Sequence, residues 1–410
     1  MPQCAINVYV GNIIHCSKPF TVEVLKNSFI AVNQNQIIAI DSVSTLENFK
    51  NEQKNYKINE VVLSEYQILI PGLIDTHIHA PQYPNLGLGL DKNLPEWLEQ
   101  HTFLLEQKFE NLDFAKKCYE VVVKKTISHG TTTAAYYATF HTEPSLILAE
   151  IAIKYGQRAF IGKVNITLNP ETYGCESETS TIEETKRFVL EVLNKKSTLV
   201  QPIITPRHTF RISTHALKGL CSLAKTYDLR IQYNSFVDPY TIVGHTVHIP
   251  IEEVHELARH KTSVSHCPSS NFNLQSGICN VKALLDAGIN VGLGSDISAG
   301  SNVGIVDQMR SAITASRALS FHIDKYKPIN CYDAFYMATL GGAKALAIDT
   351  VVGNFAVRKD FDALIVDMNV EHGNSQCLLK YDPLELFQKF VYVGDDRNIV
   401  SVFIAGKNVK

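Results

Sequence analysis

The sequence lacks the features that mark secreted, membrane-spanning and nucleic-acid-binding proteins. Its nine cysteines are odd in number, widely spaced and without a CxxC pair, which is typical of reduced thiols in the cytosol. No apolar run approaches the roughly 18 residues of a transmembrane helix, and the first residues show no secretory signal. The net charge is only −3 with scattered Lys and Arg, which argues against a nucleic acid or an acidic membrane as partner. We therefore expect a cytoplasmic protein, in the cytosol, that acts on a small molecule.

The length and the order of the residue patterns predict two domains. A chain of 410 residues with 45% hydrophobic content is long enough for an α/β barrel and a modest extra domain. Residues 5–70 hold short β-branched and aromatic runs separated by Asn and Gly, with no convincing amphipathic helix. Residues 352–410 return to this β character. We expect 1–70 together with 350–410 to form a β-sandwich domain and 71–349 to form the barrel.

Strand and helix patterns alternate between the two chain ends. Eight strand candidates predict a TIM-type (β/α)8 barrel of the α/β class, in which catalytic groups lie at the C-terminal ends of the strands. The first candidate is the apolar run 66–70 that leads to His77. The other seven lie at residues 131–137, 159–166, 200–206, 229–233, 241–247, 263–266 and 289–294. Amphipathic segments predict helices at 115–127, 144–155, 182–195, 214–227, 250–260, 281–287, 306–319 and 332–347.

Two histidines at the end of the first strand candidate indicate a metal site. His77 and His79 are two residues apart. Alternate residues of a strand project from the same face, so both imidazoles can reach one ion. Asp75 precedes them and could steady the site from behind.

Two further strand ends carry side chains that suit the same ion. His245 follows the sixth strand candidate and Asp296 follows the eighth. Three imidazoles and a carboxylate suit Zn²⁺, whose catalytic sites keep one position open for water. Zinc-bound water has a pKa of roughly 7, and Asp296 could accept its proton as the catalytic residue. Singly, His245 could be a core histidine and Asp296 a turn residue, but four such residues at the strand ends of one barrel favour the metal site.

Five segments resemble the amidohydrolase superfamily and, within it, the branch that deaminates guanine. The resemblance covers nearly the whole chain and implies zinc-dependent hydrolytic deamination of guanine to xanthine and ammonia by a homodimer. It places Zn²⁺ on His77, His79, His245 and Asp296. The segments are PGLIDTHIHAPQY at 71–83, SHGTTT at 128–133, TPR at 205–207, SHCPSSN at 265–271 and GLGSD at 292–296.

The resemblance also implies which side chains hold the substrate. Gln82 and Arg207 would bind the polar edge of guanine, since an amide and a planar guanidinium suit the carbonyl and ring nitrogens of a purine. His208 stands where this branch has a phenylalanine against the purine. Without the resemblance, Arg207 would be interpreted as a surface ion pair and Gln82 as a loop-capping amide. The complete set that we assign to the substrate is His79, Gln82, Arg207, His208 and Asp296.

One segment departs from the family pattern. The family has a third histidine after the fifth strand and, three residues later, a glutamate that transfers protons, whereas this chain has Asn234 and Val237. About seven residues separate the fifth and sixth strand candidates, but a parallel crossover needs roughly a dozen or more. The fifth βα crossover is therefore truncated. We expect low activity and exposed outer faces on these two strands, around Ile231 and Val243.

The truncation leaves alternative origins and functions open. A skipped exon, a gene-model error and a true non-catalytic paralogue would all give this sequence. A non-catalytic homologue would act in assembly or binding, and an active enzyme could instead deaminate another amino-purine or a triazine. Metal content and guanine turnover separate these alternatives.

Overall fold

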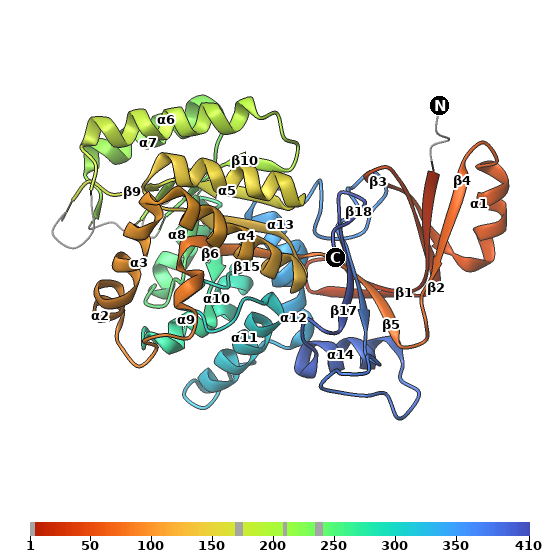
Figure 1. Ribbon diagram of the computed structural model, residues 1–410. Helices are drawn as coiled ribbons and strands as arrows, with labels where there is room; N and C mark the ends of the chain where they lie inside the picture. Colours follow the sequence, from red (N-terminus) through yellow and green to blue (C-terminus); the bar gives the residue numbers. More distant parts are fainter. Residues whose placement is uncertain (1–4, 169–174, 208–210, 234–240) are drawn as a thin grey trace.

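The residues described by the computed structural model, 5–168, 175–207, 211–233 and 241–410, form two main sheets that lie side by side (Figure 1). One is an eight-stranded parallel sheet surrounded by helices. The other is an eight-stranded sheet to which both ends of the chain contribute. Within these described ranges, no helix is long and apolar enough to cross a membrane.

The parallel sheet closes into the expected (β/α)8 barrel. Its strands follow the order β10, β8, β7, β6, β15, β14, β13 and β12. The two end strands meet where Ile204, just after β10, pairs with Ile231 of β12. The backbone N–H of Gln232 donates to the carbonyl of Ile204 at 2.9 Å across this seam. The strands are β6 (Leu73–His79), β7 (Thr131–Tyr137), β8 (Arg158–Gly162), β10 (Val200–Pro202), β12 (Ile231–Gln232), β13 (Thr241–Gly244), β14 (Ser263–His266) and β15 (Val291–Leu293).

Amphipathic helices cover the outside of the barrel, and α7 (Thr214–Tyr227) illustrates why they form. Its buried residues Ala216, Leu220 and Ala224 are four apart and so share one face. The Ser213 hydroxyl accepts the N–H of Ala216 and caps the N-terminus. The other covering helices are α4 (Leu112–Ser128), α5 (Thr142–Tyr155), α6 (Glu178–Asn194), α8 (Ile251–Arg259), α10 (Val281–Asp286) and α11 (Ile305–Leu319).

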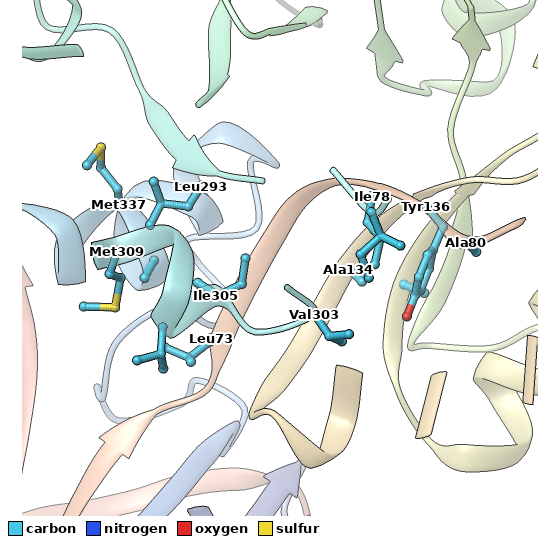
Figure 2. Close-up of a cluster of buried hydrophobic side chains, with 14 of the residues drawn as sticks. Leu73, Ile78, Ala80, Ala134, Tyr136, Leu293, Val303, Ile305, Met309 and Met337 are labelled. Atoms are coloured by element: carbon cyan, nitrogen blue, oxygen red, sulfur yellow. The ribbon is translucent and has the colours of Figure 1, made fainter. Parts of the chain in front are cut away.

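The main hydrophobic core lies between the barrel strands and these helices. Figure 2 shows Leu73 of β6 and Leu293 of β15 beside Ile305 and Met309 of α11. All four side chains are essentially inaccessible to solvent. At about 25 cal/mol per Å² of buried apolar surface, such packing is the largest favourable contribution to folding. The core thus holds the strand ends at fixed positions.

The second sheet folds into the β-sandwich, because strands from both chain ends share one buried cluster. Tyr9 of β1 stacks on Phe361 at 4.7 Å and meets the ring of Phe403 of β17 edge-on at 5.0 Å. β1 also pairs with β2, β4 and β5, and β5 pairs with β16. The strands are β1 (Ala5–Lys18), β2 (Thr21–Asn33), β3 (Gln36–Ser42), β4 (Lys57–Val62), β5 (Gln67–Pro71), β16 (Ala363–Asp367), β17 (Ile399–Ile404) and β18 (Lys407–Asn408).

Two expectations for the chain ends are wrong. The run 66–70, predicted to lead into the barrel strand, belongs to the sandwich as β5, and the barrel strand begins only at Leu73. The sandwich regions also contain two helices that the sequence pattern did not predict, α1 (Leu46–Glu52) and α14 (Pro383–Val393). The helix α1 buries only Leu46, so it has no apolar periodicity to detect.

The truncated crossover lies between β12 and β13, which are parallel neighbours. Only residues 233–240 join these strands, and Asn234 and Val237 lie outside the described residues. The prediction of an exposed apolar patch is wrong, because Ile231 and Val243 are only 5% and 7% exposed. Ile231 belongs to the main buried cluster of the barrel.

A buried ion-pair group connects the barrel to the sandwich. Arg158 of β8 donates from Nη2 to Asp360 at 2.8 Å and from Nε to Asp362 at 3.2 Å. The second carboxylate also accepts the N–H of Ala405 at 2.7 Å. The Arg158 and Asp362 side chains are 7% and 2% exposed. Removing Asp362 therefore leaves the buried Arg158 guanidinium with one carboxylate partner, Asp360.

We predict that Asp362→Ala lowers the free energy of unfolding by about 3–5 kcal/mol, because the Arg158 guanidinium stays buried with fewer partners. Glu150→Ala is the control: it removes an exposed pair with Lys195 and should cost about 1 kcal/mol or less. Urea unfolding followed by circular dichroism measures both. Equal losses in the two variants would contradict this role of the buried pair.

Candidate metal centre and adjoining pocket

Four residues that the sequence singles out meet at the C-terminal rim of the barrel. His77 and His79 end β6, His245 follows β13 and Asp296 follows β15. The Asp296 carboxylate lies at the centre. Its Oδ1 is 3.4 Å from His77 Nε2 and 3.5 Å from His79 Nε2, and its Oδ2 is 3.6 Å from His245 Nε2. The structure thus brings together three imidazole nitrogens and a carboxylate around one point.

Asp75 fixes two of these strand ends to each other. Its Oδ1 accepts the N–H of His77 at 3.1 Å and the N–H of Ser295 at 3.0 Å, and its Oδ2 accepts the Ser295 hydroxyl. Burial raises the pKa of Asp75 to about 7, although these hydrogen bonds favour the charged form. The N–H of Asp296 also donates to the carbonyl of His77 at 2.8 Å. Asp75 therefore steadies the site from behind, as expected.

The ring of His245 is held in one tautomer. Its Nδ1 lies 2.9 Å from Asn271 Oδ1 on α9 (Pro268–Asn273), and an amide oxygen only accepts, so Nδ1 carries the proton. This leaves the Nε2 lone pair facing Asp296. Burial lowers the pKa of His245, partly opposed by the Asp296 charge. The neutral imidazole is the form that binds metal ions.

Asp296 is held in its charged form. Burial raises the pKa of this carboxyl group, but the hydrogen bond with His77 and the neighbouring imidazoles outweigh it, so the pKa lies well below its usual value. His245 and Asp296 both have positive φ angles, 66° and 47°, which cost non-glycine residues about 1–3 kcal/mol each. Such strain is concentrated at functional sites. The charged carboxylate is suited to bind a cation.

The donor chemistry of this cluster fits a divalent metal ion. Imidazole nitrogen and carboxylate oxygen are ligands that Zn²⁺ accepts. Cys267, which follows β14, adds a thiol: its Sγ and the ligand atoms of His77, His245 and Asp296 all lie within 4.8 Å of one another. The sequence motif SHCPSSN contains Cys267, but we did not assign it to the site. Its position directly after a barrel strand was the available signal.

A cavity of about 250 Å³ adjoins the cluster. His79, His245 and Asp296 line it near the candidate metal ligands, and Gln82 and Arg207 supply further polar groups. Most other lining side chains are apolar, which suits a flat heterocycle. They include Leu94, Trp97, Leu98, Leu274 and Ala299.

A buried carboxylate organises the polar side of the cavity. Glu106 of α3 (Phe103–Gln107) accepts the Gln82 Nε2–H at 2.9 Å and pairs with the Arg207 guanidinium. The sequence did not reveal Glu106, because a single acidic residue in a helix carries no sign of distant partners. His208, the remaining predicted substrate contact, lies outside the described residues.

A family model described as the amidohydrolase family matches residues 68–235 and 233–409. The two matches meet at 233–235, where the sequence predicts the truncation. A solved structure of guanine deaminase from C. acetobutylicum, with bound guanine in the active site, matches with a TM-score of 0.90 at 33% identity. The match covers 99% of this chain and 100% of that one.

Curated relatives match over their full length. The guanine deaminase of Dictyostelium discoideum is 39% identical over 443 residues, covering 99% of this chain and 98% of the relative. The guanine deaminase of Homo sapiens is 37% identical over 448 residues, covering 100% and 97%. Both alignments are longer than the 410 residues of this chain, so both relatives have residues without a counterpart here.

We predict that Asn271→Ala weakens binding of Zn²⁺ by about 10–100-fold, the range typical of losing a partner that orients a ligand. The variant leaves His245 Nδ1 without its acceptor. Asn273→Ala is the matched control on the same helix, because its amide donates to the carbonyl of Ala299 and, among the described residues, to none of the candidate metal ligands. Competition with a chelator measures the affinity. An unchanged affinity for Asn271→Ala would show that Asn271 does not orient a ligand of the ion.

Proposed function

The chain belongs to the amidohydrolase family, and from this premise we propose that it catalyses the hydrolytic deamination of guanine to xanthine and ammonia. One observation carries the proposal: the three-imidazole and carboxylate cluster adjoins a cavity to which Gln82 and Arg207 contribute polar groups. Full-length similarity to guanine deaminases supports the choice of substrate.

Gln82 and Arg207 bind and orient the substrate. The guanidinium offers N–H donors, and the amide offers donors and an acceptor oxygen. These groups complement the carbonyl and ring nitrogens of a purine. Glu106 holds both side chains in place before the substrate arrives, which reduces the ordering cost of binding. We include His79, His208 and Asp296 among the substrate contacts on the family resemblance.

His77, His79, His245 and Asp296 hold the metal ion, which we propose is Zn²⁺ on the chemistry of these donors. A bound zinc ion supplies a water molecule with a pKa of roughly 7. Asp296 accepts a proton from the water that adds to the ring carbon carrying the exocyclic amine. A carbon–oxygen bond then replaces the carbon–nitrogen bond. One water proton completes the leaving ammonia and the other remains on the ring.

We also propose the coarser organisation of the molecule. Residues 1–70 with 350–410 form one domain and 71–349 the other, which the membership of the two sheets supports. The protein acts in the cytosol, which the free state of its eight described cysteines supports. It forms a homodimer, a proposal that rests on family resemblance and that light scattering during size-exclusion chromatography tests.

The second candidate is a non-catalytic homologue that acts in assembly or binding. The observation that favours it is the replacement of the family's third histidine and glutamate by Asn234 and Val237, together with the short connection 233–240. The two candidates differ in measurable ways. A catalyst retains metal and binds guanine, whereas the second candidate does neither.

We predict that the zinc-loaded protein turns over guanine about 10²–10⁴-fold more slowly than a relative that has the glutamate, because it lacks this general acid and base. The decline of guanine absorbance and the appearance of xanthine measure the rate. Turnover of another amino-purine or a triazine, but not guanine, would contradict the substrate. Absence of both metal and a guanine-induced rise in melting temperature would favour the non-catalytic candidate.

We predict that grafting the family's full crossover, with its histidine and glutamate, between Gln232 and Ile242 raises zinc content and guanine turnover together, because the graft supplies the residues that this chain lacks. The matched control carries the same graft with that histidine and glutamate changed to Asn and Val. The zinc content and the guanine turnover of both proteins are measured. A folded graft that stays at background in both measurements would show that the site is also impaired elsewhere.

A further inference from the structure

Tyr137 ends β7 and lies against two of the candidate metal ligands, yet the proposed reaction gives it no role. The centroid of its ring is 4.6 Å from that of His79 and 5.1 Å from that of His77, with interplanar angles of 31° and 57°. Both distances lie in the roughly 4.5–7 Å range of favourable aromatic pairs. The parallel register of β6 and β7 makes this contact, because it sets His79 opposite Tyr137. One aromatic side chain therefore contacts both imidazoles.

His77 depends on packing for the orientation of its ring. A histidine that binds a metal ion usually donates its other ring N–H to a carboxylate or a carbonyl group, as His245 does to Asn271. The Nδ1 atom of His77 is buried and makes no hydrogen bond with any residue that the structure describes. Its ring contacts His79, His245 and Tyr137. Of these three neighbours, Tyr137 is the one that is not itself a candidate ligand.

Hydrogen bonds across the barrel interior hold Tyr137 in place. Its hydroxyl donates to the carbonyl of Gln232 on β12 at 2.9 Å. The Gln232 side chain in turn donates to the carbonyl of Thr76, the residue before His77. The chain of contacts thus leaves β6 through the imidazoles and returns to β6 through Gln232. The Tyr137 ring is therefore fixed at its hydroxyl end as well as along its face.

We propose that Tyr137 is a positioning residue of the metal centre, whose ring fixes the ring planes of His77 and His79 so that both Nε2 atoms face one ion. The proposal rests on the proposed function for the presence of the ion, and it keeps all four ligands given there. Tyr137 is buried and is not among the described residues that line the cavity, so it acts through the ligands and not on the substrate. Its hydroxyl serves to hold the ring.

Zinc affinity, measured by competition with a chelator, tests the proposal without any assay of activity. Tyr137→Leu should weaken Zn²⁺ binding by about 10–100-fold, the range typical of losing a group that orients a metal ligand. Tyr137→Phe should stay within a few-fold of wild type, because it keeps the ring. Tyr136→Leu is the matched control, since Tyr136 is equally buried but faces the outer helices, where its hydroxyl lies 3.0 Å from that of Thr126 on α4. It should lower the melting temperature without weakening zinc binding.

Three results would overturn the proposal. Equal losses of zinc affinity in Tyr137→Leu and Tyr136→Leu would show only a general effect of destabilising the barrel. Wild-type affinity in Tyr137→Leu would show that the ring does not orient the ligands, and an equal loss in Tyr137→Phe would assign the effect to the hydroxyl. If Tyr137→Leu does not fold, Tyr137→Met replaces it, because an unbranched side chain fills the space without a ring.

Cobalt absorption gives a second measurement. The visible ligand-field bands of bound Co²⁺ depend on the geometry of its ligands, so Tyr137→Leu should change these bands and Tyr136→Leu should not. Identical bands in wild type and Tyr137→Leu would overturn the proposal. Zinc binding that depends on Tyr137, without guanine turnover, would support this proposal and reject the proposed function. Guanine turnover by wild type, with unchanged zinc affinity in Tyr137→Leu, would do the reverse.

Discussion

Closure of the parallel sheet is the constraint on which the site depends. His77, His245 and Asp296 are remote in sequence, and they meet only because the C-terminal ends of their strands form one rim. The seam between β6 and β15 has a single paired position, Leu293 with Asp75. The N–H and hydroxyl of Ser295 donate to the Asp75 carboxylate, and the Asp296 N–H donates to the His77 carbonyl, so these bonds reinforce that seam.

The barrel closes in spite of the short connection after β12. This strand has only two residues, yet it pairs in parallel register with β13, and Ile231 bridges to Ile204. Gln232 explains part of this persistence: its side chain donates to the carbonyl of Thr76, and its carbonyl accepts the Tyr137 hydroxyl at 2.9 Å. Interior hydrogen bonds thus hold β12 to β6 and β7. Closure of the barrel therefore does not depend on a full-length connection after β12.

Buried charge has different roles at the two ends of the barrel strands. At the rim, Glu106 positions Gln82 and Arg207, so that polar groups of the cavity are ordered before a ligand enters. At the opposite end, Arg158 joins the barrel to the sandwich through Asp360 and Asp362. Glu106 and Arg158 would each be costly to bury alone. Each has a charged partner from a distant part of the chain, Arg207 for Glu106 and Asp362 for Arg158.

The sequence by itself determined the (β/α)8 class, the helix at 214–227 and the four residues that gather at the rim, because strand and helix periodicity and the His77-x-His79 spacing are local properties. Only the tertiary structure decided that residues 66–70 pair with β16 in the sandwich, since an apolar run fits either sheet and its distant partner chooses between them. The same holds for Glu106 and Cys267. Their positions depend on contacts with Arg207 and with His77, which are far along the chain, and no local pattern records such a contact.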